Sequence, residues 1–155
     1  MSLANIRNFI LVVVLGFLLS ACATGGKKRT AEDYYTGTDT VKFLAAGVPD
    51  RVFFATNRSS LHSGAKDTLS KQAAYIKSSG ITVVVEGHAD ERGTRESNLA
   101  LGERRANSVR DYLMSQGVSA SSITVISYGK ERPVNPESSR LAWSQNRRAV
   151  TVKAK

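Results

Sequence analysis

Asp90 and Arg105 are the residues of this chain whose types and positions could recognise an ionic ligand. A fixed carboxylate suits an ammonium group, and the guanidinium fork of an arginine accepts a carboxylate through two parallel hydrogen bonds. Together they would select a group that carries an ammonium and a carboxylate on one carbon, because a wrong ligand would leave a buried charge unpaired. The plainer alternatives are that Asp90 caps a turn and that Arg105 is a solvated helix charge.

Two neighbouring elements are expected to position this pair. The run 81–86 is rich in β-branched residues, which is typical of a buried central strand, and 87–95 reads as a polar loop after it. A helix is expected over 96–116, with one stripe formed by Leu99, Gly102, Ala106, Val109 and Leu113. Asp90 would follow the strand and Arg105 would lie beside the stripe, so both side chains can face one cleft.

The other elements complete a single domain over 50–155. Strands are expected over 51–56, 123–128 and 148–153, a helix between the N-cap Ser63 and Gly80, and a helical turn over 141–146. The order β-α-β-α-β-β predicts an α+β fold, a two-layer sandwich with the helices on one face of a mixed sheet.

The N-terminal segment has the parts of a secretory signal. Arg7 precedes an apolar run that ends in Leu19-Ser20-Ala21-Cys22, which resembles a bacterial lipobox. The run is shorter than the roughly 20 residues of a membrane-spanning helix. We therefore expect a signal peptide over 1–21, a lipid on Cys22 and a flexible tether over 22–49, although an ordinary signal peptide or a short anchor would be the alternative.

The charge balance indicates an anionic partner. The chain carries a formal net charge of +9, and Arg7 is the only charged residue that a cleaved leader would remove. A secretory signal argues against nucleic acid, which leaves anionic polymers and lipids of the cell envelope. A basic surface with no specific anion is the alternative.

Several motifs in order resemble the OmpA-like peptidoglycan-binding domain. They are Glu86-Gly-His-Ala-Asp90-Glu-Arg-Gly-Thr94, Asn98 to Ala106, Ser127-Tyr-Gly-Lys-Glu-Arg-Pro133 and Asn146-Arg-Arg-Ala-Val150. The closest resemblance is to the lipoproteins of the Tol-Pal system. It implies a protein without catalysis or cofactor that binds the meso-diaminopimelate of peptidoglycan stem peptides. It also implies a lipid anchor in the outer membrane, on the periplasmic side, and the β-propeller protein TolB as a partner. Ala23 beside the lipidated cysteine favours the outer membrane.

The resemblance also assigns roles around the expected cleft. Phe54 and the backbone at Ala55 would form a wall, and Arg92 would contact the ligand from its loop. Leu101 would make an apolar contact beside Arg105, and Asn98 would hold the loop. Ala55 departs from the family pattern, because many members carry Asp there, so this chain lacks a side-chain contribution to affinity. Arg147 and Arg148 could each pair with an acid for a structural reason, or they could be part of a partner surface.

Parts of the sequence are compatible with two other functions. Glu86, His88, Asp90 and Glu91 could hold a metal for a wall hydrolase, but no second histidine-rich element and no nucleophile motif accompany them. The second alternative is another OmpA-like wall-binding lipoprotein that has no Tol partner.

Overall fold

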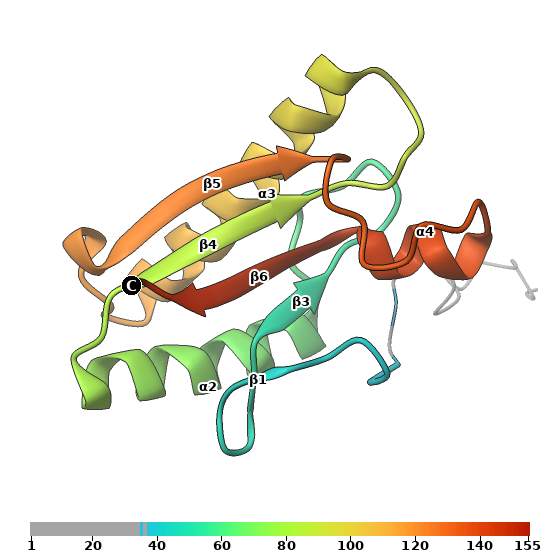
Figure 1. The fold of residues 1–155 in the computed structure, drawn as a ribbon. Helices are drawn as coiled ribbons and strands as arrows, with labels where there is room; N and C mark the ends of the chain where they lie inside the picture. Colours follow the sequence, from blue (N-terminus) through green and yellow to red (C-terminus); the bar gives the residue numbers. More distant parts are fainter. Residues whose placement is uncertain (1–34, 36) are drawn as a thin grey trace, which may run out of the picture. The chain divides into compact units, whose positions relative to one another are not determined.

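The computed structural model describes residues 35 and 37–155 (Figure 1). The expected signal peptide, Cys22 and the first part of the expected tether lie outside the described residues. The elements in chain order are β1 Phe43–Ala45, β2 Val48–Pro49, β3 Arg51–Phe53, α2 Ser63–Ser79, β4 Val83–His88, α3 Arg95–Ser115, the 3-10 turn η2 Ala120–Ser122, β5 Ile123–Gly129, α4 Arg140–Asn146 and β6 Arg148–Lys153.

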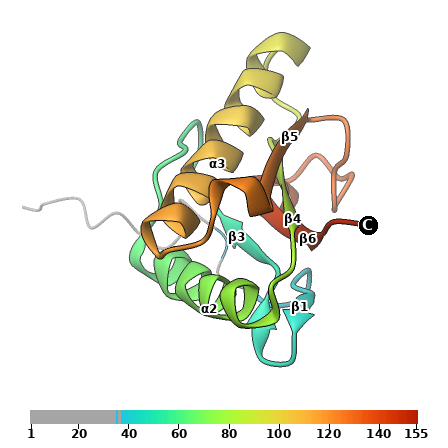
Figure 2. The same ribbon diagram turned by 90° about the vertical axis from the view of Figure 1, so that its left-hand side faces the viewer.

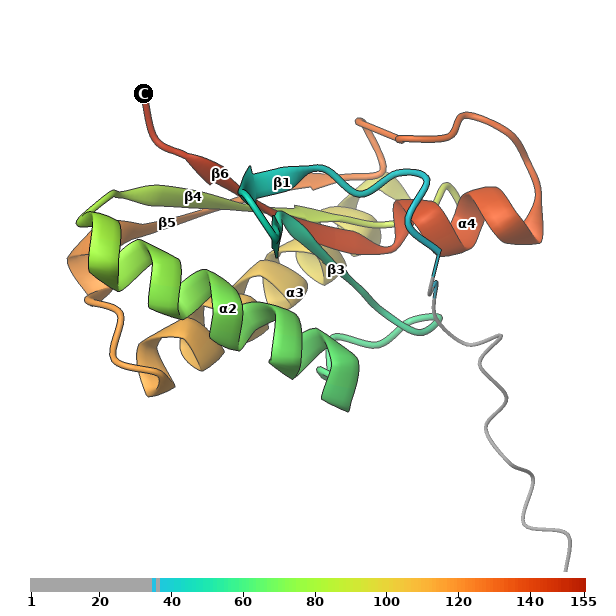
Figure 3. The same ribbon diagram turned by 90° about the horizontal axis from the view of Figure 1, so that it is seen from below.

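Strands β3 to β6 form a mixed sheet in the order β3-β6-β4-β5. β4 runs parallel to β5 and antiparallel to β6, and β6 is also antiparallel to β3. Helices α2 and α3 both pack on one face of this sheet, as Figures 2 and 3 show. The expected α+β sandwich is therefore confirmed. No helix among the described residues is long and apolar enough to cross a membrane.

The folded region includes residues that precede Asp50. β1 and β2 pair as a short antiparallel hairpin, and Leu44 belongs to the buried core, whereas Phe43 is 64% exposed. The hairpin thus occupies part of the segment that sequence reasoning assigned to the tether.

The helix ends follow local signals, with one shift. The N-cap of α2 is His62, whose Nδ1 accepts from the N–H of Ala65, and not Ser63 as expected. Gly80 ends α2 in the left-handed conformation, with φ of 63°. Thr94 caps α3 by accepting from the N–H of Ser97.

The buried face of α3 is partly polar. Its buried residues are Asn98, Leu101, Gly102, Arg105, Ala106, Val109 and Leu113. Leu99, expected in the stripe, is 48% exposed, because the face that meets the sheet runs through Asn98 and Leu101 instead. The other four residues of the expected stripe are buried, and the buried face is wider than the stripe because it also includes Asn98, Leu101 and Arg105.

Candidate ligand-binding site

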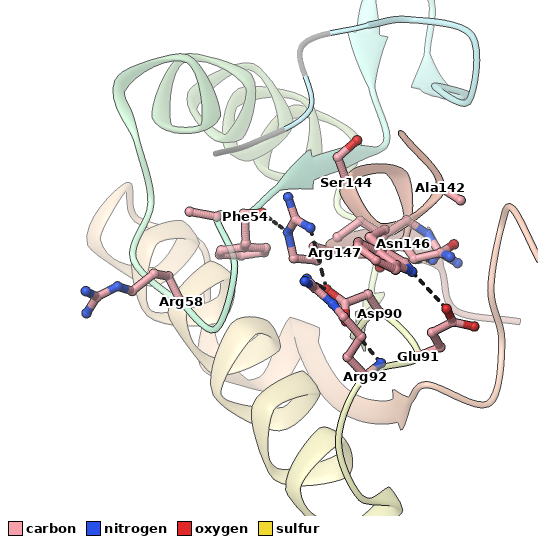
Figure 4. Close-up of polar contacts among 12 residues, drawn as sticks. Phe54, Arg58, Asp90, Glu91, Arg92, Ala142, Ser144, Asn146 and Arg147 are labelled. Carbon is pink, nitrogen blue, oxygen red and sulfur yellow. Dashed lines mark hydrogen bonds and ion pairs between the residues drawn. The ribbon is translucent and has the colours of Figure 1, made fainter. Parts of the chain in front are cut away.

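Asp90 lies just beyond β4, and its carboxylate is surrounded by cations (Figure 4). Arg92 donates from Nε to Oδ1 at 3.0 Å and from Nη2 to Oδ2 at 2.7 Å. The N–H of Arg92 also donates to Oδ1 at 3.2 Å, and Nη1 of Arg147 lies 3.5 Å from Oδ2. Asp90 therefore caps its turn, as the plainer alternative held, and in addition it is the acid of an ion cluster.

The cluster keeps Asp90 ionised. Burial by itself raises the pKa of Asp90, but the hydrogen bonds and charge of Arg92, together with the charge of Arg147, outweigh burial and hold that pKa below its usual range. Asp90 reciprocally raises the pKa of Arg92. The site thus contains a carboxylate that is only 7% exposed yet charged.

Arg105 is completely buried, which rules out a solvated helix charge. It donates to three backbone carbonyl oxygens, of Arg58 at 2.9 Å, His88 at 2.7 Å and Ala55 at 3.2 Å. Since a guanidinium has five N–H donors, one N–H remains on each of Nη1 and Nη2. Burial, with the charge of Arg147 as a second cause, lowers the pKa of Arg105 to about 9, so the side chain is still a cation at neutral pH.

Arg147 is a third cation of the site, and sequence reasoning left its role open. Its Nε donates to the carbonyl oxygen of Phe54 at 3.0 Å, and its own carbonyl accepts from the N–H of Phe54 at 2.9 Å. Arg147 immediately precedes β6, and it binds Phe54 in the segment after β3 and Asp90 at the end of β4. It therefore connects these three parts of the chain. The only sequence signal was the Asn146-Arg-Arg motif, in which strand alternation sends neighbouring side chains to opposite faces.

The loop that carries Arg92 is held on two sides. Nδ2 of Asn98 donates to the carbonyl oxygen of Arg92 at 2.9 Å. On the other side, Trp143 of α4 donates from Nε1 to Glu91 at 2.9 Å, and the Arg92 guanidinium lies 4.2 Å from the centre of the Trp143 ring. These contacts place Asn98 where the resemblance put it, and they give Trp143 a supporting position.

The remaining expected residues surround Arg105. Phe54 is fully buried, and its ring lies 5.2 Å from the Arg105 guanidinium. Leu101, at 9% exposure, lies one helical turn before Arg105. Ala55 is half-buried and contributes its carbonyl oxygen. The structure therefore brings Asp90, Arg92 and Arg105 together, but it places Arg105 and Phe54 beneath the surface.

The residues of the alternative metal site separate. Glu86 and His88 line a cavity on the sheet face opposite the helices, while Asp90 pairs with arginines and Glu91 accepts from Trp143. Within the part of the chain that the structure describes, no three His, Cys, Asp or Glu residues are grouped to hold a metal ion.

Comparisons of this chain with a family model, with curated proteins and with solved structures all point to one family. Residues 53–147 match the OmpA family. A peptidoglycan-associated lipoprotein of Mesorhizobium japonicum is 44% identical over 154 residues, covering 94% of this chain and 92% of the relative. Another, of Agrobacterium fabrum, is 56% identical over 110 residues, covering 70% and 62%. The crystal structure of the peptidoglycan-associated lipoprotein from Burkholderia pseudomallei is 38% identical with a TM-score of 0.66, covering 68% of this chain and 90% of that one. The chain therefore belongs to the OmpA family, in the group called peptidoglycan-associated lipoproteins.

Proposed function

We propose that this chain binds peptidoglycan without catalysis and recognises the meso-diaminopimelate end of the stem peptide. The observation that carries the proposal is the buried, ionised Asp90 at the end of β4, next to Arg92 and Arg147 and within electrostatic reach of Arg105. The names of the relatives support peptidoglycan as the ligand, since they are called peptidoglycan-associated.

In this proposal the ligand replaces one of the ion partners of Asp90. Arg92 is the partner that can move, because 42% of its side chain is exposed against 4% for Arg147. The ligand ammonium then takes the Asp90 carboxylate, and the released Arg92 contacts the ligand from its loop. The ligand carboxylate lies toward the two remaining N–H groups of Arg105, which a small shift of the loop uncovers.

The charges of the cluster favour a zwitterion over a simple cation. The guanidinium groups of Arg92 and Arg147 contact the Asp90 carboxylate, and that of Arg105 lies within electrostatic reach, so positive charge is in excess before the ligand arrives. Diaminopimelate brings an ammonium together with a carboxylate, whereas a lysine side chain brings the ammonium alone. Because the excess positive charge repels an unaccompanied ammonium, the site discriminates in favour of diaminopimelate.

The test is a titration of the protein with two muropeptides that differ only in diaminopimelate against lysine. We expect tighter binding of the diaminopimelate form and loss of most binding of both forms in Asp90→Ala. Arg105→Lys should reduce the preference between the two forms. Asp111→Ala and Arg104→Lys change an exposed acid and an exposed base on α3 and serve as matched controls. Equal affinity of Asp90→Ala and the unchanged protein would refute the site.

A lipid anchor on Cys22 completes the proposed function, because it would hold the domain at the outer membrane, facing the periplasm. Several anchored copies facing one continuous polymer act at high effective concentration, so each domain needs only weak affinity. Mass spectrometry of the mature N-terminus and membrane fractionation of Cys22→Ser test the anchor. A variant that still fractionates with the outer membrane would exclude it.

We further propose TolB as a protein partner that competes with the wall for the cleft, within the Tol-Pal system during envelope constriction. The resemblance to lipoproteins of that system is the support. Co-purification with TolB, followed by displacement with the diaminopimelate muropeptide, is the test. Simultaneous binding of both would refute competition, and absence of TolB would favour a wall binder outside the Tol system.

A further inference from the structure

A cavity lies on the sheet face opposite α2 and α3. It has a volume of about 620 Å³, and its floor includes Glu86 and His88 of β4 and Arg148 of β6. The segment that leads into β1 and the loop after β5 form its walls, and Figure 3 shows both on the side of the sheet away from the two helices. This cavity does not include Asp90 or Arg105, so it is separate from the site described above.

Polar groups on the floor of this cavity have no internal partner. Neither ring nitrogen of His88 makes a hydrogen bond within the described residues, and neither does Nε of Arg148. Both residues are deeply buried, at 1% and 7% exposure. Buried polar groups in folded proteins are nearly always hydrogen-bonded to protein, water or ligand. Their presence in a cavity of this size indicates that something in the cavity supplies the missing partners.

The charged residues around the cavity determine which charge a ligand must carry to bind there. Arg51 is neutralised by a bidentate pair with Asp50, at 2.7 and 2.8 Å. Among the described residues, the Arg148 guanidinium donates to two backbone carbonyl oxygens, those of Asn146 and Arg132. The guanidinium of Arg132 lies 3.7 Å from the centre of the Tyr128 ring. Neither of these two arginines forms an ion pair within the described residues.

Besides Asp50, the acids Glu86 and Asp39 line the cavity, so three acids stand against the four bases Lys42, Arg51, Arg132 and Arg148. Oε2 of Glu86 lies 3.7 Å from Nε2 of His88, and Oδ2 of Asp39 accepts from Gln145. Burial, followed by the charges of Arg148 and two other arginines, lowers the pKa of His88 to about 3. His88 is therefore neutral at physiological pH, and one of its ring nitrogens is an N–H donor.

We propose that this cavity is a binding site for a small oxyanion, either a carboxylate or a phosphate. The anion accepts hydrogen bonds from Arg148, from Arg132 at the rim and from the N–H of His88. Each arginine contact is a charge-assisted hydrogen bond, the strongest kind that a guanidinium makes with such an oxygen. The volume lies within the range of sites for small organic molecules, about 300–1,000 Å³, so the anion can belong to a larger metabolite or a short peptide.

The chain contains two histidines, which allows a direct test. The full chain in detergent, labelled with ¹⁵N-histidine, is titrated with sodium succinate and separately with inorganic phosphate at constant ionic strength. We expect saturable shifts of the ring resonances of His88 and none for His62, which caps α2. A response to succinate alone identifies a carboxylate site, and a response to phosphate alone identifies a phosphate site.

Arg132→Gln is the informative variant, because Arg132 is exposed and its loss should leave the fold intact. We expect it to weaken anion binding at least about tenfold, as removal of one charge-assisted hydrogen bond does, and to leave muropeptide affinity unchanged. Arg104→Gln, which removes an exposed arginine on α3, is the matched control. No saturable His88 shift with either anion, or equal shifts in Arg132→Gln, would overturn the proposal.

Discussion

Nη1 of Arg105 donates to the carbonyl oxygen of His88 at 2.7 Å, and this bond joins the middle of α3 to the end of β4. Asp90 follows His88 by only two positions, so the same contact sets where the acid of the site lies. Arg105 also holds Ala55 and Arg58 of the segment after β3. The Arg105 side chain therefore connects the end of β4 to the segment after β3 through its hydrogen bonds.

The first prediction concerns the stability that Arg105 provides. Arg105→Met keeps most of the volume but removes the donors to three carbonyl oxygens, each of which is costly to leave unpaired when buried. We expect the free energy of unfolding to fall by about 3 kcal/mol or more, measured by urea denaturation. Arg104→Met, on the exposed side of the same helix, should change it by less than about 0.5 kcal/mol. Equal losses in both variants would contradict the role of Arg105.

The second prediction concerns the close approach of α3 to β4. A Cβ on Gly87 would overlap the carbonyl oxygen of Gly102, and a Cβ on Gly102 would lie 2.9 Å from the carbonyl oxygen of Gly87. Gly102→Ala must therefore push α3 away from the sheet, at a cost of about 1–3 kcal/mol in unfolding free energy. Gly64→Ala, near the start of α2, is the control: its added Cβ meets only the His62 ring, at 3.3 Å, and the change should cost less than Gly102→Ala. A stable Gly102→Ala protein would show that the contact can relax.

Sequence periodicity was sufficient for the four-stranded sheet and its two helices because its signals are local, but it missed the short β1-β2 hairpin. The β-branched run of β4, Gly80 after α2 and the alternation in β6 each act within a few residues, and the strand and helix order followed from them. Periodicity failed at Leu99 because it counts apolar residues only. The buried face of α3 carries Asn98 and Arg105, whose burial depends on carbonyl groups contributed by distant segments.

Contacts between distant segments also explain which parts of the site could not be predicted from the sequence. Asp90 and Arg92 are close in the chain, and their pairing follows a short polar loop. Arg147 contacts Asp90 from a segment more than fifty positions away, and no spacing rule connects the two. Phe54 and Ala55 cover Arg105, and this arrangement also depends on tertiary packing. The ligand roles of all these residues stay predictions.

The third prediction is a pH dependence from His88. The pKa of His88 is lowered to about 3 in the folded chain, from an ordinary value of 6.5 that applies when the chain is unfolded. Between pH 3 and pH 6.5 the unfolded state therefore binds more protons at His88 than the folded state does. The free energy of unfolding should therefore fall as the pH drops below about 6.5, by up to about 1.4 kcal/mol per pH unit. Urea denaturation at several pH values measures the slope. His88→Gln should flatten it, and an unchanged slope in that variant would assign the effect to other groups.

The fourth prediction tests whether Asn98 acts through the loop. Asn98→Ala removes the donor to the carbonyl oxygen of Arg92 and should lower the unfolding free energy by about 1 kcal/mol. If the proposed wall binding holds, muropeptide affinity should fall by a few fold, with faster amide hydrogen exchange confined to 90–94. Asn98→Asp should not rescue affinity, because a carboxylate cannot donate to that carbonyl oxygen. Full affinity in Asn98→Asp would show that the hydrogen bond is dispensable.

The last prediction concerns Ala55, where the resemblance to OmpA-like domains implies an aspartate in many members. Arg92 and Arg147 contact the carboxylate of Asp90, and Arg105, whose pKa is lowered by burial and then by the charge of Arg147, adds a third cation to the site. An aspartate at 55 would offset part of this excess and would favour a ligand ammonium by Coulomb attraction. Ala55→Asp should therefore bind both the lysine and the diaminopimelate muropeptides more tightly, with the larger gain for lysine, because that ligand brings no carboxylate of its own. Calorimetric titration at low and high salt measures the gain, and Ala55→Asn separates charge from size. If Asn gives the same gain as Asp, side-chain volume and not charge is what the position lacks.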